Sequence, residues 1–501
     1  MNAPDKIIPI QPAPAGPEEI SLYEIRKKIY PRAVTGVFAT WRWSLVWATQ
    51  ILFYGLPWLT WNDRQAVLLE IAARKFYVFG LVLWPQDVIY LTALLIIAAY
   101  ALFLFTAVAG RLWCGYACPQ TVYTEIFLWV ERKIEGERLA RMRLDQAPMS
   151  LEKLVVKGLK HTSWLVIALW TGYTFVGYFT DIRDLGIRAI TWNLGPWETF
   201  WVLFYGVATY GNAGFMREQV CKYMCPYARF QSAMFDRDTL IIAYDTERGE
   251  PRGPRSRKAD PRAAGLGHCV DCNICVQVCP TGIDIRKGLQ YECIGCAACI
   301  DGCNQVMGRM GYPEGLIRYA SENALEKHLD AGAMWRRMLR PRTLIYTSLL
   351  LAIIAGTAAS LALRNPLKVD IIRDRGALAR EAAPGVIENV YRLQIMNTDE
   401  KPRRFTITAT GLDGLKVMGV TQPVEVGAAA ALLLPFELQV ALDADEGDDK
   451  HDRKHGDDKR DRKHDDDKRP KSGSHKIEIV VQAVDDPSIV RRERSSFLFP
   501  R

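Results

Sequence analysis

Eight cysteines in one short segment are the residues of this chain that most clearly predict chemistry. They form two runs, from Cys269 to Cys279 and from Cys293 to Cys303, and both have the spacing C-x2-C-x2-C-x3-C. Pro280 follows the first run, and Asn304 follows the second. A cubane iron–sulfur cluster takes one thiolate on each of four irons, and this spacing is typical of that ligation. The pattern therefore predicts two 4Fe-4S clusters and a role in electron transfer.

In such tandem runs, the last cysteine of each run ligates the cluster of the other run. The first cluster is therefore predicted to bind Cys269, Cys272, Cys275 and Cys303. The second cluster is predicted to bind Cys293, Cys296, Cys299 and Cys279. Zinc knuckles or disulfides are the alternatives, but zinc sites generally combine two C-x2-C pairs, which differs from this three-plus-one pattern.

The remaining four cysteines form two matching C-x3-C-P motifs. They are Cys114 and Cys118 in C-G-Y-A-C-P-Q, and Cys221 and Cys225 in C-K-Y-M-C-P-Y. Each motif follows two apolar stretches, which indicates a tandem duplication. Soft thiolates suit Cu(I) or iron–sulfur chemistry, so we predict that the four thiols form one metal or redox site. The alternative is that they are buried as small hydrophobic residues, and Met216 and Met224 are either thioether ligands or packing residues.

Five apolar stretches approach the length of a membrane-spanning helix. They are residues 38–60, 88–109, 162–180, 198–216 and 343–363. Residues 110–161 hold nine lysines and arginines, whereas residues 61–87 and 181–197 hold three and two. The positive-inside rule then places the N-terminus and the eight-cysteine segment in the cytoplasm and the C-terminus on the outer side of the membrane. For a bacterial inner membrane, the expected location, that outer side is the periplasm. The net charge of +8 is explained by this topology and by contact with membrane lipid, and it needs no nucleic-acid partner.

The C-terminal region alternates apolar and polar residues in about seven short segments, as strands of a sheet do. This number of strands predicts an immunoglobulin-like sandwich, which either docks a periplasmic partner or caps the membrane domain. A charged, repetitive insertion at 443–476 interrupts it, and we interpret it as a disordered hairpin extension. Its histidines are His451, His455, His464 and His475. The insertion is either a loose metal-collecting tract or a solvated segment without a metal.

Together these patterns predict a mixed fold: a polytopic α-helical membrane domain, an α+β ferredoxin domain and an all-β domain. The predicted parts are a cytoplasmic segment (1–37), a membrane domain of four spans (38–240), a twin 4Fe-4S domain (241–342), a fifth span (343–363) and an immunoglobulin-like domain (364–501).

Further motifs make the chain resemble the FixG/CcoG family of membrane polyferredoxins. They are W-P-Q-D at Trp84–Asp87, A-R-K-F-Y at Ala73–Tyr77, C-P-T-G-I-D-I-R at Cys279–Arg286 and G-L-Q-Y-E-C-I-G-C-A-A-C-I-D at Gly288–Asp301. The resemblance implies an accessory protein for assembly of cbb3-type cytochrome c oxidase, an oxidoreductase that reduces Cu(II) to Cu(I). It also implies copper-delivery or oxidase-assembly proteins as partners.

The electron donor is a separate question. No G-x-G-x-x-G motif is followed by an acidic residue in a strand–helix context, so we expect no directly bound nicotinamide or flavin. Electrons are then expected from a partner protein or from quinol. The alternative function is a quinol-linked membrane carrier, similar to NapH proteins, that passes electrons to another redox partner. A third possibility is a scaffold whose clusters only stabilise the fold.

Overall fold

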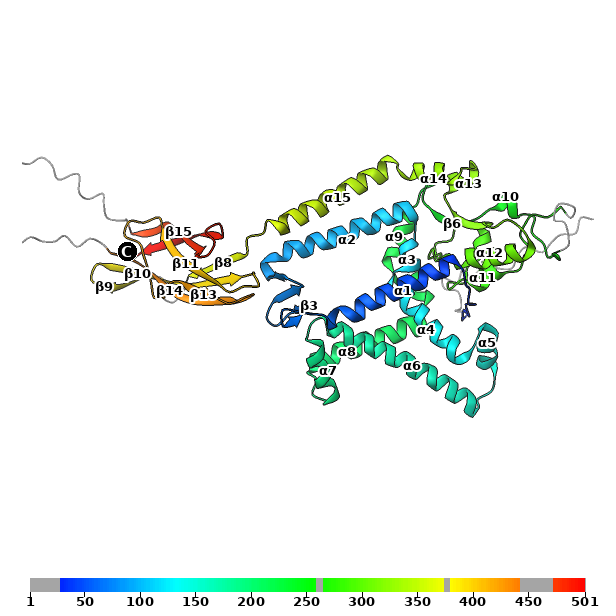
Figure 1. Cartoon of the computed structure of the whole chain (residues 1–501), viewed down its shortest axis with the longest axis horizontal. Helices are drawn as coiled ribbons and strands as arrows, with labels where there is room; N and C mark the ends of the chain where they lie inside the picture. The colour runs from blue at the N-terminus through cyan, green and yellow to red at the C-terminus, as the bar shows by residue number, and fades with distance from the viewer. Residues whose placement is uncertain (1–27, 258–264, 374–378, 442–471, 501) are drawn as a thin grey trace, which may run out of the picture.

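The computed structural model describes residues 28–257, 265–373, 379–441 and 472–500. The cysteine-rich segment and the C-terminal β-domain lie at opposite ends of two long helices, α2 (Val88–Ala109) and α15 (Pro341–Ala362) (Figure 1). A group of further helices lies between the two ends and holds the C-x3-C-P motifs. The chain therefore separates its cluster-binding segment from its β-domain by the length of a helical layer.

Within the described residues, two helices are long and apolar enough to cross a membrane by length and composition: Pro85–Ala109 and Pro341–Ala362. They include α2 and α15, which pack side by side (Figure 1). The hydroxyl of Tyr90 on α2 donates a hydrogen bond to the carbonyl of Ser360 on α15 at 3.2 Å. The predicted spans at 88–109 and 343–363 correspond to these two helices.

The other three predicted spans fall on helices of a different character. They lie on α1 (Val37–Gly55), on α6 (Leu151–Val176) and on α8 (Pro196–Thr209) with the π-helical turn that follows it. Helix α1 contains a buried arginine, Arg42. The first half of α6 contains lysines, and α8 has only 14 residues. Each departs from a long uncharged apolar helix, so the five-span topology stays a prediction.

Short helices connect these long ones around the C-x3-C-P motifs. They are α3 (Leu112–Tyr116), α4 (Pro119–Glu135), α5 (Arg138–Gln146), α7 (Ile182–Ile190), the π-helical segments η3 (Tyr210–Met216) and η4 (Val220–Met224), and α9 (Pro226–Met234). Proline sets the start of two of them: it occupies the first position of α4 and of α9, where its missing N–H costs nothing.

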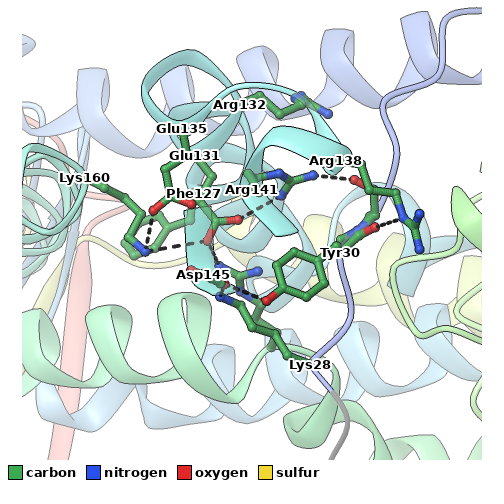
Figure 2. A network of polar contacts seen from close by, with 12 residues as sticks. Lys28, Tyr30, Phe127, Glu131, Arg132, Glu135, Arg138, Arg141, Asp145 and Lys160 are labelled. Carbon is green, nitrogen blue, oxygen red and sulfur yellow. Dashed lines mark hydrogen bonds and ion pairs between the residues drawn. The ribbon is translucent and has the colours of Figure 1, made fainter. Parts of the chain in front are cut away.

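A buried network of charged side chains fastens α4, α5 and α6 together (Figure 2). The carboxylate of Glu131 on α4 accepts a hydrogen bond from Arg141 on α5 at 3.1 Å, and Lys160 on α6 lies 3.0 Å from Glu135 on α4. Arg141 also donates to the carbonyl of Pro31 at 2.6 Å, which ties the segment before α1 to α5. Because these charges are buried but paired, they fix the arrangement of the helices.

The loop predicted at 61–87 is a small β-structure that joins the helices to the β-domain. Its strands are β1 (Thr60–Trp61), β2 (Arg64–Gln65), β3 (Val67–Glu70), β4 (Lys75–Val78) and β5 (Leu81–Leu83). Arg64 pairs with Glu400 of the β-domain at 2.6 Å, and the Lys75 ammonium donates to the carbonyl of Ala429 at 3.0 Å. Asp87 of the W-P-Q-D motif pairs with Lys368. The A-R-K-F-Y motif, through Lys75, and the W-P-Q-D motif, through Asp87, therefore both contact the β-domain.

The β-domain is a sandwich of two antiparallel sheets, with strand orders β12-β14-β10-β8 and β13-β11-β15-β16, and β9 pairs with β10. The strands are β8 (Leu367–Arg373), β9 (Arg380–Ala383), β10 (Val386–Asn397), β11 (Arg403–Thr410), β12 (Lys416–Met418), β13 (Val424–Val426), β14 (Ala431–Ala441), β15 (Gly473–Ala483) and β16 (Val490–Phe499). Tyr391, Phe405, Phe436 and Phe497 fill the interior from both sheets. The alternating pattern in the sequence thus places one face of each strand in a common core.

The insertion predicted at 443–476 needs two corrections. Its last residues, from Gly473, belong to β15. Strands β14 and β15 lie in different sheets, so the segment between them links the two sheets and is not a hairpin extension. The reason is that an apolar–polar alternation identifies a strand but not the sheet it joins. Most of the insertion, including His451, His455 and His464, lies outside the described residues, whereas His475 lies on β15.

Candidate iron–sulfur and thiol sites

The cysteine-rich segment folds into two similar loops, held by an antiparallel pair of strands, β6 (Ile241–Tyr244) and β7 (Ile317–Ala320). Its helices are α10 (Thr246–Gly249), α11 (Ile274–Gln277), α12 (Ala298–Met310), α13 (Glu322–Glu326) and α14 (Ala331–Met338). A buried group of apolar side chains, including Ile285 and Ile317, packs between the loops and this pair of strands. The segment is therefore a small α+β unit.

The two loops have the same backbone conformation. The second cysteine of each run is flanked by residues with positive φ: Asp271 (51°) and Asn273 (55°) in the first, Gly295 (69°) and Ala297 (58°) in the second. Left-handed backbone turns the chain sharply, and it is rare outside glycine, asparagine and aspartate. Ala297 is the unusual member of this set. The repeated strain indicates that both runs build the same kind of tight loop.

The loops surround two cavities, and each cavity brings together cysteines of both runs. The first cavity is lined by Cys269, Cys272, Cys275 and Cys303. The second is lined by Cys279, Cys293, Cys296 and Cys299, with Cys275 also in its wall. The last cysteine of each run thus lies with the first three of the other run. An apolar cavity walled by four thiols fits the donor set of a 4Fe-4S cluster.

Burial of these thiols has a clear electrostatic consequence. It raises the pKa of Cys275, Cys293 and Cys303 to about 12, and that of Cys296 to about 11. A thiolate at these positions requires a compensating positive charge, which iron supplies when it binds. Within the described residues, no three cysteine, histidine or carboxylate side chains gather closely enough to hold a single metal ion.

In both C-x3-C-P motifs the second cysteine precedes a new helix. Cys118 caps α4 and Cys225 caps α9, while Cys114 lies on α3 and Cys221 lies in the π-helical turn η4. The prolines thus begin new helices, which is one of the two arrangements that the sequence allows. In each motif the first cysteine therefore lies in the preceding helical segment, and the second caps the helix that follows.

The two motifs approach each other. Burial, together with the smaller effects of the thiols of Cys118, Cys114 and Cys225, raises the pKa of Cys221 to about 12, against the opposing charge of Arg111. Cys114 is buried and Cys118 is half-buried, and the loss of solvent raises the pKa of both thiols. Cys114 of the first motif and Cys221 of the second pack in one apolar cluster, so the duplicated motifs lie side by side.

This thiol group lies directly against the loop of the second cluster. A Cβ atom added to Gly115 would lie 2.7 Å from Cα of Cys296, and one added to Gly295 would lie 3.0 Å from the carbonyl oxygen of Arg111. Cys114 and Cys221 share one apolar cluster with Ile294 and Cys296. The two cysteine groups, which the sequence separates by more than forty residues, are therefore in contact.

Polar contacts fix this junction. Arg42 of α1 donates a hydrogen bond to the carbonyl of Cys296 at 2.6 Å, and Tyr319 donates to the carbonyl of Gly295 at 2.6 Å. The hydroxyl of Tyr319 also lies 3.4 Å from that of Tyr116 in the first C-x3-C-P motif. Glycine at 295 and 115 permits the approach, and these hydrogen bonds hold it.

Arginines at this junction are the functional residues that sequence reasoning missed. Arg111 donates to the carbonyl of Tyr291 and, at 2.9 Å, to the side-chain carbonyl of Gln231, whose same oxygen accepts from Cys114 at 3.5 Å. In the sequence, Arg111 stands out only as one of the nine basic residues between 110 and 161 that indicate the topology. An available signal for Arg42 was its place inside an apolar stretch, because a charge there usually has a function.

Comparison with known proteins gives the family. The chain is 42% identical to protein RdxA of Cereibacter sphaeroides over 79% of this chain and 85% of that protein. It is 37% identical to the nitrogen fixation protein FixG of Rhizobium meliloti over 85% of this chain and 90% of that protein. The chain belongs to the FixG family. Residues 357–500 match the family model described as the IG-like fold at the C-terminal of FixG, which confirms the immunoglobulin-like fold and the resemblance noted from the motifs.

Two further family models describe the iron–sulfur regions of this FixG-family protein. Residues 216–322 match a 4Fe-4S dicluster domain, and residues 90–136 match a 4Fe-4S binding domain. The ferredoxin-type protein NapH of Haemophilus influenzae is 24% identical over 42% of this chain and 66% of that protein. The protein is therefore a membrane-type 4Fe-4S electron-transfer protein of the FixG family.

Proposed function

We propose that this FixG-family protein passes electrons from two 4Fe-4S clusters to the four thiols of the C-x3-C-P motifs and reduces Cu(II) to Cu(I) there. The observation that carries the proposal is the contact between Gly115 and Cys296, because it joins the cluster loop to the thiol group without an intervening layer. The reduced copper would serve the copper centre of the cbb3-type cytochrome c oxidase.

The ligands follow from the two cavities. Cys269, Cys272, Cys275 and Cys303 would hold the first cluster, and Cys293, Cys296, Cys299 and Cys279 the second. Each cluster, when bound, stores one electron and releases it at a potential that neighbouring charges adjust. Cys296 lies beside the thiol group, so electrons reach the thiols from the second cluster site.

Copper reduction suits the chemistry of the thiols. Cu(II) prefers nitrogen and oxygen ligands, whereas Cu(I) prefers sulfur, so four thiols stabilise the product of the one-electron step. Cys114 and Cys221, one thiol from each motif, pack in the same apolar cluster and would contribute two of the sulfur ligands. Their raised pKa values mean that binding as thiolates releases protons.

The arrangement along the long helices supports a topology for this role. The cluster segment and the β-domain lie at opposite ends of α2 and α15 (Figure 1). We place the cluster segment in the cytoplasm and the β-domain in the periplasm of the inner membrane, with α1, α6 and α8 as three further spans. Copper-delivery or oxidase-assembly proteins are the partners that fit this placement.

The experiment that tests the function uses the full-length protein, purified without oxygen, reduced with dithionite and freed of excess reductant. Cu(II) is added with a Cu(I)-specific chelator. The variants Cys114→Ala and Cys221→Ala are expected to keep their iron content and to lose most Cu(I) formation. Met224→Leu is the matched control, because this side chain lies inside the second motif but is 56% exposed. Full Cu(I) formation by a variant lacking all four thiols would exclude the proposal.

A further inference from the structure

A cavity of about 540 Å³ lies beside the second cluster site. The segment before α1, the first half of α1, helix α4 and the loop around Cys296 form its walls. Cys221 of the second C-x3-C-P motif also lines it. The cavity therefore reaches a predicted ligand of the second cluster, and a molecule inside it would lie within electron-transfer distance of that cluster.

The charge of the cavity wall selects its occupant. Five arginines line it: Arg32, Arg42, Arg132, Arg141 and Arg217. Glu125 and Glu218 are the carboxylates of the same wall. Part of this positive charge is compensated, since Arg132 lies 3.8 Å from Glu125 and other arginines pair with Glu131 beneath the wall. The excess of guanidinium groups favours a polar head group whose oxygens accept hydrogen bonds.

The cavity continues into a long apolar groove. The groove has a volume of about 920 Å³, runs between α1, α4 and α6, and shares Trp43, Trp47 and Arg132 with the cavity. Apolar side chains such as Ile126 and Ile167 form most of its remaining wall. A ligand that fits both spaces has a small head that accepts hydrogen bonds and a long apolar tail.

We propose that the cavity and the groove bind a membrane quinol, which donates its electrons to the second cluster site. This inference rests on the cluster part of the proposed function and not on copper. A quinol is favoured over a phospholipid because Cys296, a predicted ligand of the second cluster, lines the head-group cavity and would accept electrons only from a redox-active head. In the reaction the quinol loses two electrons and two protons and becomes quinone. Each of the two clusters gains one electron, and the protons pass to Glu125 and to water.

The electrostatics of the second cluster site suit a quinol donor. Arg42 and Arg111 both donate hydrogen bonds to backbone carbonyls of the second loop. Positive charge beside a cluster stabilises its reduced form and raises its reduction potential. A raised potential at the second site brings the cluster closer to the range in which a quinol can reduce it.

The test mixes the oxygen-free, full-length protein with menadiol and follows cluster reduction by electron paramagnetic resonance. Ser44→Trp fills the cavity from an exposed position on its wall, and Ala48→Trp is the matched control one turn further along α1, also exposed and outside both spaces. We expect at least ten-fold slower reduction by menadiol in Ser44→Trp, the wild-type rate in Ala48→Trp, and equal reduction of all three proteins by dithionite. If Ser44→Trp does not assemble its clusters, Thr40→Trp fills the same cavity.

Three results would overturn the inference. Equal menadiol rates in Ser44→Trp and Ala48→Trp would place the quinol elsewhere. Reduction of the wild type by dithionite but not by menadiol would indicate a protein donor. Phospholipid retained in the cavity and not displaced by quinone would assign the site to lipid. Failure of copper reduction by the dithionite-reduced protein would instead count against the proposed acceptor and would leave the quinol site unaffected.

Discussion

Gly115 of the first C-x3-C-P motif packs directly on Cys296 of the second cluster loop, with space for no side chain between them. An added Cβ would lie 2.7 Å from Cα and 2.8 Å from the backbone nitrogen of Cys296. These neighbours are backbone atoms and cannot rotate away. The relay from cluster to thiol therefore depends on a residue without a side chain.

The variant Gly115→Ala tests this contact. Overpacking of this kind typically costs about 1–3 kcal/mol, and here it must also push the cluster loop away from the thiols. We expect slower electron transfer from the reduced clusters to copper, measured by rapid mixing. Gly158→Ala on α6 is the control, because nothing lies within 4 Å of its added Cβ, and it is expected to be neutral or slightly stabilising. Identical transfer rates in the two variants would mean that the contact has no part in the relay.

Arg42 is expected to raise the reduction potential of the second cluster and not that of the first. Its guanidinium donates to the carbonyl of Cys296 at 2.6 Å, so Arg42→Gln removes a positive charge beside the second site only. The potential of the second cluster should fall by on the order of 50 mV. The first cluster serves as the internal control in a redox titration followed by electron paramagnetic resonance. An equal shift of both potentials would disagree with this assignment.

Glu131 is the central carboxylate of the buried charge network (Figure 2). Burial favours its neutral form, but Arg217, Arg141 and Lys160 outweigh burial and hold its pKa below the ordinary value. Glu131→Gln leaves these cations without their partner, and we expect a loss of about 3–5 kcal/mol of stability. Glu152→Gln, at the exposed start of α6, is the control, with an expected change below about 0.5 kcal/mol.

The pH dependence of this effect has a definite sign. Because the folded-state pKa of Glu131 is depressed, its stabilising contribution is present at every pH above about 4.5 and is lost only as the pH falls below that value. The difference in thermal midpoint between Glu131→Gln and the wild type should therefore stay constant between pH 6 and 8. A difference that shrinks steadily within this range would show that another group controls the network.

The charged insertion offers a test of its own. We expect that replacing residues 443–471 with a short Gly/Ser linker leaves the thermal midpoint of the sandwich and the copper reduction unchanged. The reason is that β14 ends at Ala441 and β15 begins at Gly473, so the replaced residues lie outside both strands. Copper content is measured on the intact protein and on the variant. A clear loss of bound copper would support a metal-collecting role for the histidines of the insertion.

Much of the architecture could be predicted from the sequence because its signals are local. The alternation along β11 and β15 and the long apolar runs of α2 and α15 each depend on neighbouring residues. The spacing rule for tandem clusters also anticipated that Cys303 lies with the first run. Strands β9 and β13 were not predicted, because each is very short.

The junction between the cysteine groups could not be predicted because it depends on packing between distant segments. Nothing near Gly115 in the chain indicates that Cys296 lies against it. In the sequence, Arg42 is a charged residue inside an apolar stretch. In the structure it donates a hydrogen bond to the carbonyl of Cys296, more than 250 positions away. The span count was uncertain for the same reason, since α1 and α6 combine apolar faces with charges that pack inside the protein.

The most direct test of the relay is rapid oxygen-free mixing of the reduced full-length protein with Cu(II), with both partners followed together. We predict that the reduced-cluster signal disappears at the rate at which Cu(I) forms, with about one Cu(I) per cluster electron. Substitution of Cys114 and Cys221 should slow both processes equally. Cu(I) that forms while the clusters stay reduced, or clusters that reoxidise at the wild-type rate in the thiol variant, would contradict the account.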